Sequence, residues 1–295
     1  MRLSGKEAAQ ALAEQLSCRV AALQARGVTP TLALIRVGEN PADESYAKGI
    51  CTRAESLGVA ISPVNLPMGA SAEEVLCALD QVNGAEEIHG CLLFRPLPEY
   101  LKCREWEICN RLAPEKDVDG MTALSAAGVY AGKALGYPPC TAQACMELLD
   151  YYGIDPAGKQ AAVLGRSLVI GRPAAMMLTA RNATVSLLHT ATENPASYIR
   201  QADILITAAG QKNLVTADLV HPGQVILDVS MNYDPEKPTA KGKGGMVGDC
   251  DYAAIEPLGV AITPVPGGVG ALTNTVLMKH LIQAAEKAPA VNRAV

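Results

Sequence analysis

A short strand, a glycine-bearing turn and a helix follow one another near the middle of this 295-residue chain, and this succession restricts the fold more than any other feature. The apolar run Gln160–Leu164 is typical of a buried strand, residues 165–173 contain the turn, and Pro173 suits the first turn of a helix. Backbone N–H groups and the positive end of the helix dipole converge in such a turn, which favours a phosphate group. Only Gly165 and Gly171 are glycines, so the stretch alone fits an ordinary tight turn equally well.

Further strands at regular spacing favour a nucleotide-binding sheet. Three more apolar runs follow, with room for helices between them, at residues 184–188, 202–210 and 225–229. This pattern predicts a doubly wound parallel sheet. A separate alternation comes first, with strands expected at residues 31–38, 59–61 and 90–94 and helices at 4–26, 41–57 and 72–82. We therefore predict a two-lobed α/β protein, joined at the Pro- and Gly-rich residues 136–140 where Thr141 can cap the next helix, with a last helix over 273–285.

Composition and charge exclude several classes of function. The net charge of −5 has no concentrated basic face behind it, which argues against nucleic acid as a partner. No apolar run approaches the roughly 18 residues that a membrane helix needs, and the N-terminus lacks the apolar core of a signal peptide. The nine cysteines show no CxxC pairing, so we expect reduced, buried thiols in a cytoplasmic protein and no metal site.

Six separated segments give the chain a family resemblance. They span nearly the whole sequence and are rich in glycine, proline and charged residues: residues 37–42 with Tyr46, Pro96–Pro98, Lys116–Gly120, Pro139–Thr141, Gly165–Ser167 and Thr263–Gly270. Together they resemble the methylenetetrahydrofolate dehydrogenase/methenyltetrahydrofolate cyclohydrolase family. The resemblance implies hydride transfer from 5,10-methylenetetrahydrofolate to NAD(P)⁺ in one-carbon metabolism. It also implies a homodimer and folate bound between the lobes.

The resemblance further implies how the chain divides. Residues 1–139 with 272–295 would form the folate-binding catalytic domain, with the C-terminal helix returning to the first lobe. Residues 140–271 would form a Rossmann-type NAD(P)-binding domain.

Site residues are carried over position by position from the same resemblance. Asp119 is the expected pterin anchor, because a carboxylate can accept two N–H bonds from the pterin edge; a loop-capping aspartate is the alternative. Tyr46 would stack on the aminobenzoyl ring. The folate wall would contain Pro264, Pro266, Gly267 and Gly268. The nucleotide would be held by Thr141, Gly165, Arg166, Ser167, Gly171, His189, Thr190, Ala209, Gly210 and Asn232.

Two departures from the family pattern bear on the second reaction. Where the family carries a lysine one helical turn after the tyrosine, this chain has Ile50, and Phe94 replaces a glutamine that contacts that lysine. Lys48 points to another face of the helix, so we expect it to be solvated. Because the lysine–glutamine pair moves protons during methenyl hydrolysis, its loss predicts a dehydrogenase with an impaired or absent cyclohydrolase. A bifunctional enzyme using other groups and a degenerate folate- or nucleotide-binding paralogue are the alternatives.

The cofactor assignment favours NADP over NAD. The strand at residues 184–188 is followed by no Asp or Glu that would hold a ribose 2′-hydroxyl, as NAD enzymes often have. Arg166 and Thr190 stand at family positions that contact the NADP 2′-phosphate. Glu193 adds an unfavourable negative charge, so NAD stays open.

Overall fold

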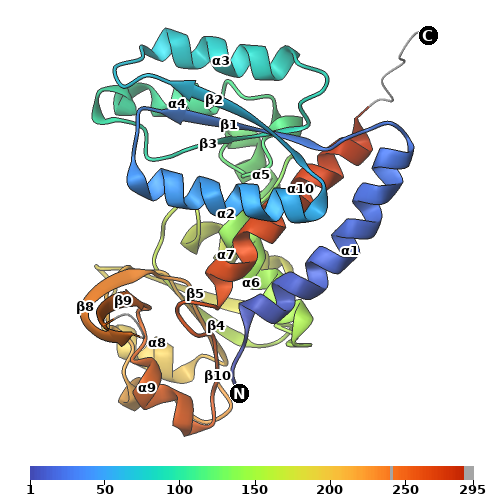
Figure 1. Cartoon of the computed structure of the whole chain (residues 1–295). Helices are drawn as coiled ribbons and strands as arrows, with labels where there is room; N and C mark the ends of the chain where they lie inside the picture. Colours follow the sequence, from blue (N-terminus) through green and yellow to red (C-terminus); the bar gives the residue numbers. More distant parts are fainter. Residues whose placement is uncertain (240–241, 289–295) are drawn as a thin grey trace. The chain divides into compact units, whose positions relative to one another are not determined.

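The computed structural model describes residues 1–239 and 242–288, which form two compact units (Figure 1). The Tyr46 unit comprises Ala11–Cys140 and the chain from Asn274 onward, and the Gly165 unit comprises Met1–Gln10 and Thr141–Thr273. The sequence-based division differs at the N-terminus, which it assigned to the first lobe. Leu3 N–H donates to the Ile262 carbonyl at 2.9 Å, so the first residues join the sheet of the Gly165 unit. The last seven residues, also assigned to the first lobe, lie outside the described residues.

The Tyr46 unit contains a parallel three-stranded sheet in the order β2-β1-β3. One face, with α3 and α4 packed on it, holds a core that includes Ile35, Val75 and Leu93. On the other face, Phe94, directly after β3, meets Tyr46 of α2, and Gly90 of β3 lies close to Leu281 of α10. The elements are β1 Thr31–Val37, α2 Pro41–Leu57, β2 Ala60–Leu66, α3 Ala72–Gly84, β3 Gly90–Leu93, α4 Glu105–Cys109 and α5 Ala123–Ala131, together with most of α1 Gly5–Ala25 and α10 Val269–Lys287.

The Gly165 unit is built on a parallel five-stranded sheet in the order β10-β7-β6-β4-β5. Strand β4 is central and is followed directly by the glycine turn and α7, as the sequence predicts. The strands β6 and β7 are shorter than expected, and the antiparallel β8–β9 hairpin is an addition. The elements are α6 Cys140–Tyr151, β4 Gln160–Leu164, α7 Gly171–Ala180, β5 Thr184–Leu188, α8 Pro195–Gln201, β6 Ile204–Thr207, β7 Val225–Asp228, β8 Asn232–Thr239, β9 Gly242–Val247, α9 Tyr252–Ile255 and β10 Ala261–Ile262.

Several details correct the sequence-based expectations. Helix α6 begins at Cys140, so Thr141 lies in its first turn and is not its N-cap. Helix α10 begins four residues earlier than predicted and crosses from one unit into the other at residues 273–274. All nine cysteines are free, but Cys18, Cys51, Cys77 and Cys103 are exposed and not buried. No helix in the described parts of the chain is both long and apolar enough to cross a membrane.

Candidate active site

Two aspartates of the Lys116–Gly120 stretch have separate environments. Asp117 is fully buried, and its carboxylate accepts hydrogen bonds from the backbone N–H groups of Met121 and Thr122 and from the hydroxyls of Thr122 and Ser125, at 2.6–2.9 Å. It therefore caps the loop and the start of α5. The Asp119 side chain is 22% exposed, and no backbone N–H bond to it occurs among the described residues. Its oxygens retain the acceptor capacity that a ligand with paired N–H donors would use.

A tight turn holds Asp119 in place. Gly120 adopts φ +71°, and a Cβ there would lie 2.6 Å from the Pro138 carbonyl carbon and the Tyr137 oxygen. The turn is thus pressed onto the segment before α6, where only glycine fits. Lys116 secures the other side of the turn, since its Nζ donates to the carbonyls of Val82, Asn83 and Ala85 at the end of α3. The Lys116–Gly120 stretch is therefore largely structural, and Asp119 is its residue that stays accessible to a ligand.

The pKa of Asp119 is raised to about 6. Burial is the main cause, because it disfavours the charged carboxylate. The Arg95 guanidinium, whose Nη2 lies 3.7 Å from Oδ2 of Asp119, opposes this effect. The Asp117 carboxylate raises the pKa further, and a hydrogen bond with the Cys140 thiol lowers it. The sequence reasoning did not single out Arg95.

An apolar wall stands where the family resemblance implies a lysine and a glutamine. Ile50 on α2 has no exposed surface, and Phe94, directly after β3, is 6% exposed. The Phe94 ring meets the ring of Tyr46 edge-on, with centroids 6.0 Å apart and an interplanar angle of 79°. Tyr46 itself is 37% exposed, so its ring is available to a ligand. Lys48 is exposed, as expected, and does not replace the missing lysine.

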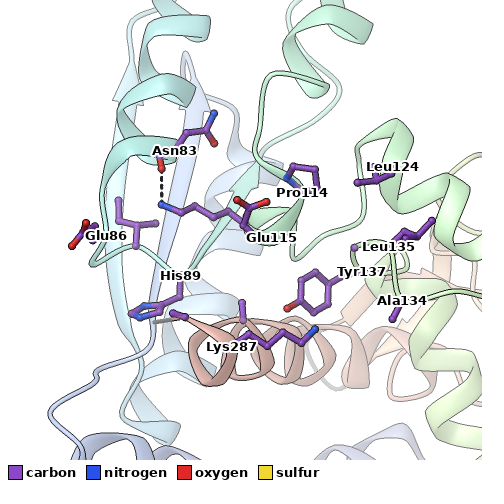
Figure 2. Close-up of a pocket in the computed structure, with 15 residues that line it drawn as sticks. Asn83, Glu86, His89, Pro114, Glu115, Leu124, Ala134, Leu135, Tyr137 and Lys287 are labelled. Atoms are coloured by element: carbon purple, nitrogen blue, oxygen red, sulfur yellow. Dashed lines mark hydrogen bonds between the residues drawn. The ribbon is translucent and has the colours of Figure 1, made fainter. Parts of the chain in front are cut away.

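A cavity of about 830 Å³ in the same unit lies at the opposite edge of the sheet (Figure 2). Its lining includes Ile88 and His89, which precede β3, whereas Phe94 and Arg95 follow that strand. Lys287, on α10, lies over the ring of Tyr137 at 5.1 Å. None of the predicted folate residues lines this cavity, so we do not assign it to the substrate.

The glycine turn of the other unit forms a cradle that side chains would fill. A Cβ on Gly165 would lie 2.4 Å from the Ala208 carbonyl oxygen, and one on Gly171 would lie 1.9 Å from the Gly165 oxygen. The hydroxyl of Ser167 accepts a hydrogen bond from the Ile170 N–H at 3.1 Å, which shapes the loop before α7. Arg166 and Ser167 are exposed. An exposed guanidinium near a helix N-terminus and a backbone without side chains suits a dinucleotide phosphate, so the residues fit the expected cofactor.

A buried aspartate that the sequence reasoning missed ties three predicted cofactor residues together. Asp249 has no exposed surface, and its carboxylate accepts from the N–H groups of Ala209 and Gln211, the hydroxyls of Thr207 and Ser230, and the amide of Asn232, at 2.7–3.1 Å. Ser230 in turn accepts from the Gly210 N–H at 3.0 Å. The ends of β6, β7 and β9 are thereby fixed to one another at the carboxyl edge of the sheet, where α/β folds bind nucleotides.

The turn after β5 is ordered by its own residues. His189 N–H donates to the Thr192 hydroxyl at 2.8 Å, and the His189 Nδ1 accepts from the Ala191 N–H at 3.2 Å. Thr190 is exposed at the tip of this turn. No acidic group faces a ribose from β5 itself, although Glu193 is exposed four residues beyond His189.

The proline-rich wall also lies in the Gly165 unit. Val265–Pro266 is a cis peptide, and Gly267 has φ +106°. A Cβ on Gly268 would lie 2.6 Å from the Pro264 oxygen, so the backbone folds closely on itself. Lys237 on β8 donates to the Val265 carbonyl at 3.2 Å and so ties the loop to β8.

Comparison with known proteins matches both halves of the chain to one family. Residues 3–119 match the catalytic domain of tetrahydrofolate dehydrogenase/cyclohydrolase, and residues 139–289 match the NAD(P)-binding domain of the same family. The chain belongs to the tetrahydrofolate dehydrogenase/cyclohydrolase family. This confirms the resemblance, the two-domain α/β fold and the assignment as an NAD(P)-dependent enzyme of that family.

Individual relatives agree over nearly their full lengths. The bifunctional protein FolD of Carboxydothermus hydrogenoformans is 44% identical over 285 residues, which cover 97% of each chain. The crystal structure of FolD from Campylobacter jejuni, a methylenetetrahydrofolate dehydrogenase/cyclohydrolase, has a TM-score of 0.90 and 34% identity, covering 97% of this chain and 98% of that one. The Trypanosoma brucei enzyme, solved with NADP and an inhibitor, has a TM-score of 0.90 and 29% identity, with 97% of each chain covered.

Proposed function

We propose that this family member is an NADP-dependent 5,10-methylenetetrahydrofolate dehydrogenase whose cyclohydrolase step is impaired or lost. The observation that carries the proposal is the buried apolar pair Ile50 and Phe94 beside Tyr46. Neither side chain can accept, donate or orient a proton. The bound nicotinamide nucleotide would supply the hydride acceptor.

The two reactions of the family make different demands on this wall. In the dehydrogenation, the methylene carbon loses a hydride with its bonding electrons and becomes a methenyl cation delocalised over N5 and N10. That step depends chiefly on alignment, which Asp119 and Tyr46 can provide from their side of the site. Hydrolysis of the methenyl group requires a water to attack the carbon and a proton to move afterwards. An apolar wall offers no group for either task and also disfavours a nearby water.

The nucleotide side of the proposal rests on the Gly165 unit. The cradle of Gly165, Ser167 and Gly171 would hold the phosphates, and Arg166 would pair with the 2′-phosphate that distinguishes NADP. Ala209, Gly210 and Asn232, fixed through Asp249, would form the adjacent rim. The NADP-bound Trypanosoma brucei relative supports this preference.

A fully bifunctional enzyme is the second candidate, because relatives such as the Carboxydothermus hydrogenoformans protein are named as bifunctional. One assay separates the two candidates. The purified protein is given 5,10-methylenetetrahydrofolate with NADP⁺ or NAD⁺, and reduced nucleotide and methenyltetrahydrofolate are followed by absorbance. Methenyltetrahydrofolate is then supplied directly, and its decay is compared with a protein-free control. We expect nucleotide reduction, methenyl accumulation and decay at the spontaneous rate, whereas accelerated decay would establish the bifunctional enzyme.

We also propose that the protein acts as a homodimer in the cytoplasm. The family resemblance supports the dimer, and nine free cysteines suit a reducing compartment. Sedimentation of the purified protein gives the oligomeric state directly.

A further inference from the structure

Arg95 connects two predicted folate-site positions of the Tyr46 unit, Phe94 and Asp119. It follows Phe94 and precedes Pro96, so its backbone belongs to the loop that leaves β3, while its side chain reaches the turn that carries Asp119. The side chain is 23% exposed, and its Nη2 lies 3.7 Å from the Asp119 carboxylate. Its Nε is buried and has no hydrogen-bond partner among the described residues.

This geometry differs from that of a close, bidentate salt bridge. Several other arginines meet carboxylates through two close bonds, as Arg181 does with Asp150 at 2.6 and 2.9 Å. At 3.7 Å, with one donor left unpaired, Arg95 gains little from fixing Asp119 rigidly. A buried unpaired donor such as the Arg95 Nε costs free energy, so fold stability alone does not explain why an arginine stands at this position.

We propose that Arg95 is a positioning residue for the folate. Its positive charge holds Asp119 in the ionised, acceptor-only form that the paired N–H donors of a pterin edge require. This inference rests on the proposed function, because it takes Asp119 as the pterin anchor. A protonated Asp119 would present an O–H in place of one acceptor and would lose one of the two bonds.

The charges around Asp119 show why a cation is needed. Burial and the Asp117 carboxylate both favour its neutral form, whereas the Cys140 thiol and Arg95 favour the charged one. The hydroxyl of Tyr46 and the thiol of Cys91 also lie within electrostatic reach and carry no positive charge at neutral pH. With Arg95 present the pKa of Asp119 is about 6, so the carboxylate is mostly ionised at pH 7. An opposite charge at this range typically lowers a carboxyl pKa by about 1–3 pH units, so without Arg95 the group would be substantially neutral at pH 7.

The test compares Arg95→Met with a matched control. Methionine keeps an apolar stem in the buried part of the site and removes the charge. Arg36→Gln is the control, because Arg36 is in the same unit, is 21% exposed and also stands 3.7 Å from a carboxylate, that of Glu44. For each protein the pH dependence of kcat/KM for methylenetetrahydrofolate is measured with saturating NADP⁺, together with calorimetric binding of tetrahydrofolate from pH 5.5 to 9.5.

We expect Arg95→Met to move the acid limb of both profiles upward by roughly 1–3 pH units. At pH 7 this corresponds to a loss of about 2- to 100-fold, mainly in KM, that disappears at alkaline pH. Arg95→Lys should restore most of the difference, Arg36→Gln should leave the limb in place, and Asp119→Asn should make weak binding independent of pH. Superimposable profiles for Arg95→Met and the unaltered protein would overturn the proposal, as would a loss that is equal at every pH.

The binding measurement keeps this test separate from the proposed function. A protein that binds tetrahydrofolate but does not reduce nucleotide would defeat the dehydrogenase proposal and still report the ionisation of Asp119. If Arg95→Met is unstable by circular dichroism, Arg95→Gln serves as the second neutral variant under the same criteria.

Discussion

Rebuilding the missing proton-transfer pair, by Ile50→Lys and Phe94→Gln, is the most direct test of why hydrolysis should fail. The Phe94 ring meets the Tyr46 ring edge-on, Ile50 lies one helical turn after Tyr46 on α2, and both side chains are almost fully buried. A lysine at position 50 alone would place an ammonium where Ile50 has no exposed surface, with no hydrogen-bonding side chain at position 94. Desolvation of a fully buried lysine lowers its pKa by up to about 3–5 pH units. Ile50→Lys alone should therefore be destabilising and should restore little hydrolysis.

The double variant should behave differently because the glutamine carbonyl can accept from the lysine. Hydrogen bonding to the charged amine favours its protonated form and orients it, so proton transfer becomes possible. General acid–base groups typically contribute about 10²–10⁴-fold in rate, so partial recovery is measurable. The cost is in stability: replacing a buried aromatic removes about 3–5 kcal/mol of packing, and the edge-on contact with Tyr46 accounts for about 0.5–1.5 kcal/mol of it.

The assay follows the decay of methenyltetrahydrofolate at fixed pH, with urea unfolding measured in parallel. An apolar double variant, Ile50→Met with Phe94→Leu, is the matched control, since it alters the same positions without a polar group. Dehydrogenase activity should survive in every variant within about tenfold, because Asp119 and Tyr46 are untouched. A folded, folate-binding Ile50→Lys/Phe94→Gln protein with no more hydrolysis than the apolar control would refute the reasoning.

Three further predictions concern single aspartate and arginine positions. Arg166→Ala should weaken the binding of NADP by roughly 1.5–3 kcal/mol and the binding of NAD much less, as measured by titration with each nucleotide. An equal loss of affinity for both would make Arg166 a structural residue of the turn. Asp249→Asn should lower the free energy of urea unfolding by about 3–5 kcal/mol and weaken the binding of both nucleotides, because an amide cannot accept from all five donors. Ser230→Ala, which removes one of these donors, is the milder control. Asp119→Asn should stabilise the folate-free protein at pH 8 by up to about 3 kcal/mol. Folding raises the pKa of Asp119 to about 6, so the protonated carboxyl contributes its full stability below about pH 4, and this contribution is lost as the pH rises through 6. Thermal unfolding at pH 4 and pH 8 checks this sign, and a larger gain at pH 4 would contradict it.

The local sequence pattern predicted a helix or strand correctly wherever the residues of that element suffice to specify it. The apolar run before Gly165 is a strand, and α2 spans Pro41–Leu57 as predicted, because periodicity and a proline start specify a helix without distant contacts. The β8 strand was missed because Pro235 and Pro238 interrupt it, and proline weakens any strand prediction. Strand β8 is stabilised by its antiparallel pairing with β9, and the sequence of β8 alone does not predict this pairing.

The sequence by itself determined the two α/β lobes, the glycine turn and which residues stand at the family's motif positions, including the apolar residues at 50 and 94. Only the tertiary structure decided which aspartate caps the loop and which stays open to a ligand, because Asp117 and Asp119 differ in their partners and not in their local pattern. It alone showed Arg95 beside Asp119, 24 positions along the chain, and Asp249 beneath Ala209 and Asn232. These contacts arise because the carboxyl ends of parallel strands bring loops that are distant in sequence to one edge of a sheet, and the charge and hydrogen-bond partners of a buried group are set there.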